Sequence, residues 1–216
     1  MDQTLQLNGQ EVAFSPGQTI LEVARENNVS IPTLCHLRRA EPIGSCRICV
    51  VEVNRGEELL PACSTPANAG MDILTHSDRV VQARREILSM LMHTGHHDCP
   101  ICDKAGECDL QDLVYAYGVE HVPMTKRPQY TVPEYATPNI RYWPERCILC
   151  QRCVTMCNEV LGIHAISMQG SGNQARVVPS NPERCVSCGE CLSVCPTGAL
   201  TENLSRYKGR PWLVDR

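Results

Sequence analysis

The chain has 216 residues, enough for two or three small domains but not for one large enzyme core. Charged residues make up 20% and the formal net charge is -4, which argues against a basic surface for nucleic acid. No apolar run approaches the roughly 18 to 20 residues of a membrane span, so we expect no direct membrane insertion. The first residues lack the basic and apolar regions of an export signal, which predicts a cytoplasmic protein.

The chain contains 15 cysteines, well above the usage of ordinary globular proteins. An odd number cannot be consumed entirely by disulfides within one chain. Because thiols stay reduced in the cytoplasm, a chain this rich in cysteine is typical of a metal protein.

The last eight cysteines form an internal repeat. The same letters, Pro-Glu-Arg-Cys, end at Cys147 and at Cys185, and every cysteine of the first copy recurs at an offset of 38. Both copies have the C-x2-C-x2-C-x3-C spacing that holds [4Fe–4S] clusters. The copies comprise Cys147, Cys150, Cys153 and Cys157, then Cys185, Cys188, Cys191 and Cys195.

In such a run the fourth cysteine serves the other cluster, because it lies too far round the following helix to reach its own. The predicted ligand sets are Cys147, Cys150 and Cys153 with Cys195, and Cys185, Cys188 and Cys191 with Cys157. A pair of zinc knuckles is the alternative, since isolated C-x2-C pairs bind zinc. Four cysteines in so short a run, duplicated, fit zinc poorly.

The first group is spaced C-x10-C-x2-C-x13-C and consists of Cys35, Cys46, Cys49 and Cys63. Around it, residues 4–14 alternate about an Asn-Gly turn, residues 19–26 open with a capping box, and residues 48–53 form a β-branched strand. Hairpin, helix and strand, with cysteines in the loop, predict a β-grasp ferredoxin domain with one [2Fe–2S] cluster. A zinc ribbon would need a second C-x2-C pair.

The middle group follows an amphipathic helix predicted over residues 79–92. It has only three thiols, Cys99, Cys102 and Cys108, so a fourth cluster needs one ligand that is not cysteine. Histidines stand directly upstream: His93, His96 and His97. A zinc site of three cysteines and one histidine is the alternative, and the three neighbouring clusters favour a [4Fe–4S] cluster instead.

Two further segments have plain interpretations. Residues 122–143 contain repeated prolines with little apolar periodicity, which predicts an extended linker. Gly170 to Ala175 matches a dinucleotide-binding pattern but follows no convincing strand, so it indicates a hairpin.

The three cysteine groups together resemble a known module. The segments Gly-Ser-Cys-Arg-Ile-Cys and His-His-Asp-Cys-Pro-Ile-Cys-Asp-Lys-Ala-Gly-Glu-Cys, followed by a twin-cluster ferredoxin, are similar to the N-terminal iron–sulfur module of the large subunit of respiratory complex I (75 kDa type). The same module occurs in [FeFe]-hydrogenases and in the alpha subunits of NAD-linked formate dehydrogenases. The stand-alone diaphorase small subunit of NAD-reducing hydrogenases is also similar.

The resemblance also bears on the histidine and on the C-terminus. The common family pattern, H-x3-C, has Gly95 at the histidine position, whereas a variant, G-x-H-x-C, aligns His97 with the ligand. We therefore choose His97, with His96 as the alternative. The segment 208–212, Lys-Gly-Arg-Pro-Trp, is similar to the sequence that leads into the molybdopterin domain of formate dehydrogenases.

The sequence thus predicts an α+β chain of three cluster domains. Expected bounds are 1–78 for the β-grasp domain, 79–121 for a small helical [4Fe–4S] domain with one His and three Cys ligands, 122–143 for the linker, 144–205 for the twin [4Fe–4S] domain and 206–216 for a tail. One [2Fe–2S] and three [4Fe–4S] clusters are expected.

The resemblance implies an electron-transfer subunit of a multi-subunit oxidoreductase, with no substrate active site or catalytic residue of its own. It would relay electrons between a flavin- and NAD(P)H-binding diaphorase subunit and a catalytic subunit, either a molybdopterin formate dehydrogenase or a hydrogenase. Two alternatives remain: an iron–sulfur fragment of a split catalytic subunit, and a zinc-stabilised scaffold.

Overall fold

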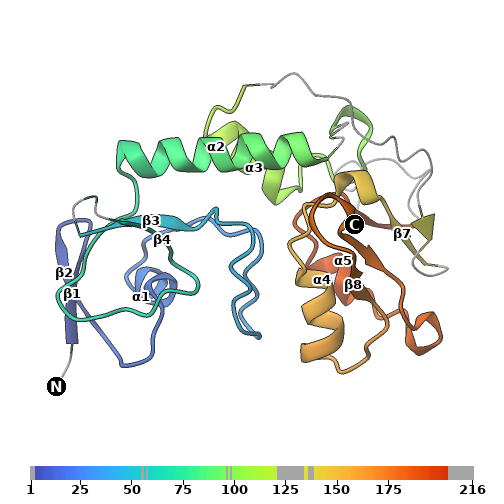
Figure 1. The fold of residues 1–216 in the computed structure, drawn as a ribbon, viewed down its shortest axis with the longest axis horizontal. Coiled ribbons are helices and arrows are strands. Elements are labelled where there is room, and N and C mark those ends of the chain that lie inside the picture. Colours follow the sequence, from blue (N-terminus) through green and yellow to red (C-terminus); the bar gives the residue numbers. More distant parts are fainter. Residues whose placement is uncertain are drawn as a thin grey trace, which may run out of the picture.

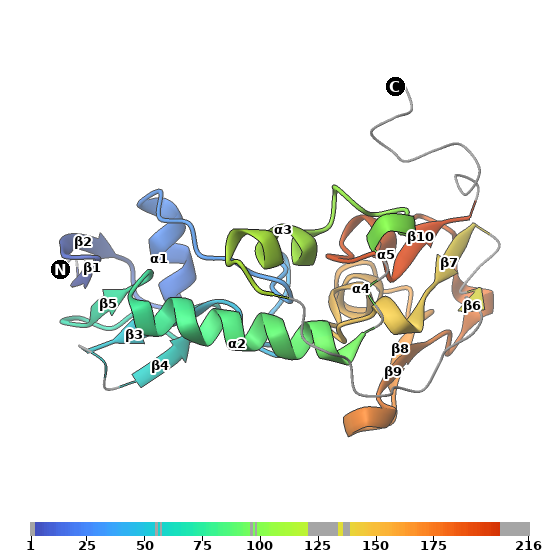
Figure 2. The ribbon, with the colours of Figure 1, turned by 90° about the horizontal axis from the view of Figure 1, so that it is seen from above.

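The computed structural model describes residues 3–54, 56, 58–95, 97, 99–120, 134–135 and 139–203. A sheet domain and a cysteine-rich domain lie at opposite ends of the molecule, and a long helix, α2 (Asp78–Thr94), runs between them (Figure 1). From above, α3 (Asp109–Ala116) lies alongside α2 (Figure 2). None of the helices in these ranges is long and apolar enough to cross a membrane.

The N-terminal domain is a five-stranded mixed sheet. Its strands are β1 (Gln3–Leu7), β2 (Gln10–Phe14), β3 (Val50–Val53), β4 (Glu58–Pro61) and β5 (Asp72–Leu74), in the order β2-β1-β5-β3-β4. Strand β1 is parallel to β5, and the other pairs are antiparallel. The predicted hairpin is confirmed: Asn8 and Gly9 both have positive φ, 54° and 81°, as the favoured two-residue turn requires.

Helix α1 (Ile20–Glu26) packs against this sheet and begins at the predicted capping box. The Thr19 side chain accepts from the Glu22 backbone N–H, and the Glu22 carboxylate accepts from the Thr19 backbone N–H. The backbone N–H of Leu21 donates to the carbonyl of Ala62 at 2.9 Å. The start of α1 is thereby tied to the segment that carries Cys63.

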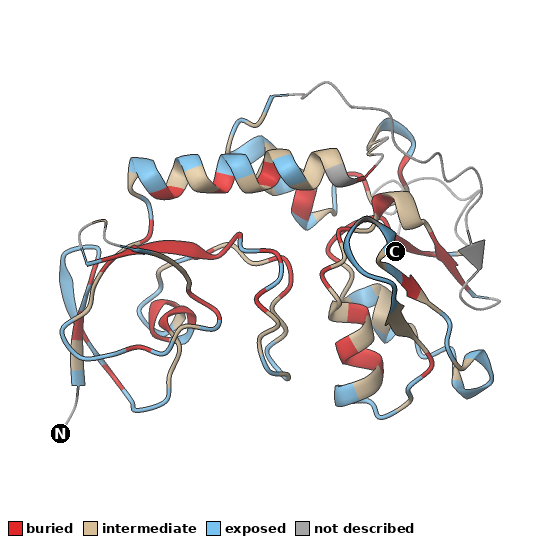
Figure 3. Cartoon of the chain, in the orientation of Figure 1, coloured by how far each residue is buried: buried red, intermediate tan, exposed pale blue. Residues whose placement is uncertain are grey.

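Helix α2 is the predicted amphipathic helix, and buried and exposed residues alternate along it (Figure 3). One of its buried residues is a cation. Arg84 is fully buried; its Nη2 donates to the Val50 carbonyl at 2.8 Å and its Nη1 to the Tyr117 hydroxyl at 2.8 Å. This guanidinium joins the strand that follows Cys49 to the turn that ends α3.

The C-terminal domain is built from short elements. Its strands are β6 (Glu134–Tyr135), β7 (Ile140–Tyr142), β8 (Ser167–Gln169), β9 (Arg176–Val178) and β10 (Leu200–Glu202), which form a β10-β7-β6 sheet and a β8-β9 hairpin. Its α-helices are α4 (Arg152–Thr155), which continues into a π-helical turn, η3 (Met156–Val160), and α5 (Glu190–Ser193). The hairpin predicted at Gly170–Ala175 is confirmed by the antiparallel pairing of β8 with β9.

Single 3-10 turns complete the fold. They are η1 (Cys99–Ile101), η2 (Pro144–Arg146), η4 (Gly172–Gln174) and η5 (Pro182–Arg184). The two copies of the repeat each begin with such a turn, η2 and η5, which places Cys147 and Cys185 at equivalent C-caps.

The structure differs from the predicted linker over residues 122–143. Residues 121–133 and 136–138 lie outside the described part, but β7 belongs to the sheet of the C-terminal domain, and Ile140, Arg141 and Tyr142 are all buried. The flanking prolines concealed a strand of only three residues. Arg141 is accommodated in it because its Nη2 donates to Asn203 at 2.7 Å and its guanidinium lies 5.7 Å from the Trp143 ring.

Candidate metal centres

The first cysteine group is brought together at a buried site beside the sheet. Cys35, Cys46, Cys49 and Cys63 are between 1% and 8% exposed. Cys35 interacts with the thiols of Cys46 and Cys63, and Cys49 with that of Cys63, so that the four side chains form one connected set. These thiols come from three separate segments, which α1 and β3 hold in place.

The thiols of the first group shift one another's pKa values through hydrogen bonds. Hydrogen bonding to the Cys35 thiol raises the pKa of Cys46, and hydrogen bonding to Cys35 and Cys49 raises the pKa of Cys63. Hydrogen bonding from Cys63 lowers the pKa of Cys49 to about 7. Thiolates held this close in a buried site repel each other, so a cationic centre between them would be strongly stabilising.

The middle group lines a small pocket. Its walls include His97, all three middle cysteines, Arg146 and Gly198. Burial raises the pKa of the Cys108 thiol to about 11. A Cβ added at Gly198 would collide with Cys102 Sγ, so the backbone there lies directly against the thiol. Arg146 is 4% exposed and stacks on Trp143, with its Cζ 4.2 Å from the ring centroid.

His97 is the middle-group histidine that the structure places at the pocket, whereas His96 lies outside the described residues. The Nε2 atom of His97 lies 3.3 Å from the carbonyl oxygen of Leu91. A carbonyl only accepts, so Nε2 carries the hydrogen of this bond and Nδ1 carries the lone pair of the neutral ring. A metal-binding histidine is oriented by just such a bond to a backbone carbonyl.

Gly95 makes the position of this ring possible. A Cβ on residue 95 would lie 2.6 Å from His97 Nε2 and would also collide with the Glu145 carbonyl. By contrast, His93 is turned back onto its own helix, with Nδ1 2.8 Å from the Ser89 carbonyl. The glycine that replaces the histidine of the common family pattern therefore makes room for His97.

The C-terminal repeat brings each set of three cysteines to a fourth from the other copy. After burial, the main influence that raises the pKa of both Cys150 and Cys153 is the Cys195 thiol. Burial likewise raises the pKa of Cys191 to about 12, with Cys188, Cys157 and Cys185 contributing. These neighbours agree with the sets expected from the spacing, which stay a prediction. We call them the inner set (Cys147, Cys150, Cys153, Cys195) and the outer set (Cys185, Cys188, Cys191, Cys157).

The two sets differ in exposure. Cys150 and Cys153 of the inner set are buried, whereas Cys188 of the outer set is exposed, and its neighbour Val186 is 69% exposed. The outer set lines an apolar pocket with Tyr142 and Val177. The outer site is thus apolar inside and open at one rim.

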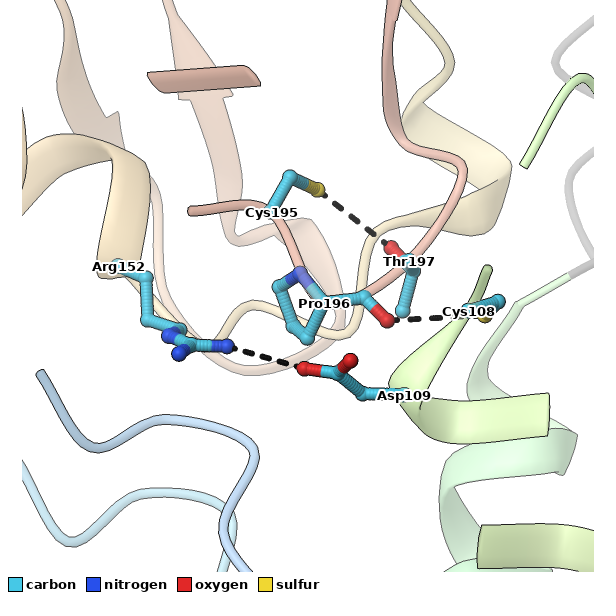
Figure 4. A network of polar contacts seen from close by, with 6 residues as sticks. All are labelled: Cys108, Asp109, Arg152, Cys195, Pro196 and Thr197. Atoms are coloured by element: carbon cyan, nitrogen blue, oxygen red, sulfur yellow. Dashed lines mark hydrogen bonds and ion pairs between the residues drawn. The ribbon is translucent and has the colours of Figure 1, made fainter. Parts of the chain in front are cut away.

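The first group, the middle group and the inner set are in contact with one another. One apolar cluster contains Cys35 and Cys46 of the first group and Cys150 of the inner set, and Cys108 packs against it; its other members include Leu34, Ile48, Leu88, Leu110 and Ile148. Cys108 Sγ also donates to the carbonyl of Pro196, at 3.6 Å, and Pro196 is bonded to Cys195 (Figure 4). The inner set therefore adjoins both the first group and the middle group.

The thiols fit iron–sulfur clusters by their chemistry and surroundings. Soft thiolate donors in sets of four, or of three with an imidazole, suit iron–sulfur clusters. Among the described residues, no three His, Cys, Asp or Glu side chains are arranged to hold a single metal ion. The four cysteine groups are therefore assigned from the contacts and burial given above.

Sequence reasoning missed several residues of these sites. Gly198 and Arg146 at the middle pocket had no pattern to mark them, because they lie far along the chain from Cys102. Asp109, the first residue of α3, pairs with Arg152, Oδ2 to Nη1, at 3.3 Å (Figure 4). Arg152 was missed as well, although the offset of the repeat aligns it with Glu190 of the second copy.

Three family models match successive parts of the chain. Residues 3–78 match a 2Fe-2S iron-sulfur cluster binding domain, residues 84–123 the NADH-ubiquinone oxidoreductase-G iron-sulfur binding region, and residues 146–199 a 4Fe-4S dicluster domain. The chain therefore contains one [2Fe–2S] domain and [4Fe–4S] domains.

Curated proteins and a solved structure match over nearly the whole chain. NADPH-Fe(3+) oxidoreductase subunit alpha of Geobacter sulfurreducens is 35% identical over 97% of this chain and 25% of its own length. An NADH-quinone oxidoreductase subunit of Rhizobium meliloti is 39% identical over 95% of this chain and 25% of its own. A chain of the NAD+-reducing [NiFe]-hydrogenase in the H2-reduced state is 31% identical, with a TM-score of 0.83, over 96% of this chain and 90% of that one.

The relatives differ in length from this chain. The chain spans about a quarter of the length of these two curated relatives, and nearly all of the matched hydrogenase chain.

Proposed function

Because this chain belongs to the iron–sulfur protein family of the NADH-ubiquinone oxidoreductase-G type, we propose that it relays electrons within a multi-subunit oxidoreductase. One partner would bind flavin and oxidise or reduce NAD(P)H, and another would carry the terminal catalytic site. The observation that carries this function is the meeting of the first, middle and inner cysteine groups at one shared apolar cluster.

We assign one [2Fe–2S] and three [4Fe–4S] clusters to the four groups. The [2Fe–2S] cluster takes the first group, in a β-grasp domain, and the middle [4Fe–4S] cluster takes His97 with Cys99, Cys102 and Cys108. The remaining two take the inner and outer sets. Such clusters supply one-electron transfer at potentials that their surroundings set.

The chain's own residues hold and shield these sites. Helix α1 and strand β3 fix the first group, the Leu91 carbonyl orients His97, and Gly198 lets the backbone approach Cys102. Apolar burial around Cys150 and Cys46 excludes water and lowers the local dielectric, so that nearby charges act strongly on the clusters.

The arrangement supports an order for the relay. The inner cluster would stand between the [2Fe–2S] cluster, through the shared apolar cluster, and the middle cluster, through Cys108, Pro196 and Cys195. The outer cluster would lie beyond it in the C-terminal domain. The exposed Cys188 and Val186 suit that end to contact with a redox partner.

The proposed catalytic partner is either a hydrogenase or a formate dehydrogenase. The relatives are hydrogenase, NADPH–iron(III) and NADH-quinone oxidoreductases. The formate dehydrogenase prediction rests on the segment 208–212, which lies outside the described residues. If the chain forms part of a longer catalytic subunit, its cysteine groups would relay electrons in the same order.

Iron and sulfide analysis tests this function. After anaerobic purification or reconstitution, about 14 iron atoms per chain are expected, with EPR signals of one [2Fe–2S] and several [4Fe–4S] clusters after reduction. A colourless protein that holds zinc, or one with iron well below about ten atoms per chain, would contradict the four-cluster relay. Subunits that co-purify would identify the terminal substrate.

The His97 assignment has its own test. A His97→Cys variant is expected to keep the middle cluster but to lower its midpoint potential, because an anionic thiolate replaces a neutral imidazole. An EPR redox titration measures the shift, and His93→Cys is the matched control, since His93 bonds to Ser89. An unshifted potential in His97→Cys, with the cluster still present, refutes the assignment.

A further inference from the structure

The two copies of the C-terminal repeat carry opposite charges at one structurally equivalent position. Arg152 is the first residue of α4 and Glu190 the first residue of α5, 38 positions later. Each follows a residue in the left-handed region, Gln151 with φ 62° and Gly189 with φ 79°. Each also stands two residues after the second cysteine of its set. The two side chains therefore start from matching places beside the inner and the outer site.

Arg152 is held close to the inner site. Its side chain is only 19% exposed, its Nη1 lies 3.3 Å from Asp109 Oδ2, and its Nε is buried without a hydrogen-bond partner (Figure 4). Arg152 stands two residues after Cys150 and directly before Cys153, so its positive charge lies beside two ligands of the inner set. A positive charge at this place favours negative charge on the inner site.

Arg152 also lies within electrostatic reach of the other two sites. Cys150, two residues before Arg152, shares one apolar cluster with Cys35 and Cys46 of the first group. Asp109, its ion-pair partner, directly follows Cys108. One guanidinium thus stands where the first group, the middle group and the inner set meet.

Glu190 has the opposite effect in a more open setting. It is exposed, and its carboxylate accepts from the Ser193 hydroxyl within the same short helix at 3.2 Å. Reduction adds one electron, hence one negative charge, to a cluster, so a nearby cation stabilises the reduced state and a nearby anion destabilises it. Screening by solvent makes the effect of Glu190 the smaller one.

We propose that the positive charge of Arg152 raises the reduction potential of the inner cluster above that of the outer cluster. The inner cluster is then reduced first, and it collects electrons at the place where the first group, the middle group and the inner set meet. The proposal rests on the proposed function, because it needs the inner and outer sets to hold [4Fe–4S] clusters. It deepens that function by naming the residue that makes two clusters of the same ligand pattern unequal.

An anaerobic EPR redox titration of the full chain, with its partners when they co-purify, tests this proposal. In Arg152→Gln the equilibrium ratio of reduced to oxidised inner cluster is expected to fall about tenfold at a fixed potential, a shift of about 59 mV for a one-electron couple. Arg152→Lys keeps the positive charge, so the potential of its inner cluster should stay close to the wild-type value. Asp109→Asn removes the counter-charge of Arg152 and should raise the potential of the inner cluster.

Glu190→Gln is the matched control from the other copy. It should raise only the outer cluster's potential, and the shift should be smaller than the one that Arg152→Gln causes at the inner cluster. A Cys188→Ser variant, which perturbs only the outer set, assigns the EPR signals to the two clusters. Unchanged inner potentials in both Arg152→Gln and Asp109→Asn, with iron content intact, overturn the proposal.

The same measurements separate this proposal from the proposed function. A wild-type chain that lacks the clusters refutes the relay itself, whereas intact clusters with insensitive potentials refute only the role of Arg152. If Arg152→Gln loses iron, the charge-retaining Arg152→Lys and the Asp109→Asn variant decide, since neither removes the cation.

Discussion

A Gly198→Ala variant is expected to fold but to lose the middle cluster, and with it about four of about 14 iron atoms per chain. The added Cβ would occupy the place of Cys102 Sγ and would lie 3.3 Å from Lys104 Cβ. A free thiol can rotate away from the intruding methyl group, but a thiol bound to iron cannot. Iron analysis and the loss of one set of EPR signals measure the effect.

The control for this variant is Gly172→Ala. Gly172 lies in the turn between β8 and β9, and a Cβ there meets nothing within 4 Å. Its positive φ of 56° makes alanine cost roughly 1–2 kcal/mol in backbone energy, so the control is stringent for stability while leaving the sites untouched. Full iron content in Gly198→Ala would show that Cys102 does not bind iron where the structure places it.

Replacement of Cys63 by alanine is expected to abolish the [2Fe–2S] cluster and to leave the [4Fe–4S] signals in place. Cys63 is 1% exposed, and its thiol contacts both Cys35 and Cys49, so its loss opens the centre of the set. About two iron atoms per chain should be lost. The N-terminal domain should also melt at a lower temperature, because a bound cluster stabilises only the folded chain.

Ser64→Ala is the matched control, one residue along the chain. Ser64 is exposed, and the substitution removes a hydroxyl without changing a thiol. It should keep full iron content and an unchanged melting temperature. A [2Fe–2S] EPR signal that persists in Cys63→Ala would mean that the first group does not hold this cluster.

Local features of the sequence predicted the local structure well. The Asn8-Gly9 turn and the Thr19 capping box formed as expected, because each depends on residues within four positions of one another. Three members of each C-terminal set lie close together because they share one short run, and the assignment of the fourth ligand stays a prediction. The strand β7 was missed, since three residues between prolines carry no periodicity and are stabilised by pairing with β10.

At the middle group, the sequence could not show which histidine lies beside the three cysteines. The sequence predicts one ligand that is not cysteine and offers His93, His96 and His97 for it. The tertiary structure turned His93 onto Ser89 and brought His97 to the pocket, because Gly95 and the Leu91 carbonyl shape the end of α2.

The fifteen cysteines, their spacing and the opposite charges of Arg152 and Glu190 can be read from the sequence, because they are properties of composition and short spacing. The tertiary structure shows in addition that Arg152 reaches Asp109, that Gly198 lies against Cys102 and that Cys150 shares an apolar cluster with Cys46. Each of these pairs is separated by more than forty positions, and residues so far apart meet only when whole elements pack together. The sequence therefore predicts the cysteine groups, and the packing of α2, α3 and the C-terminal repeat sets which of these groups are neighbours.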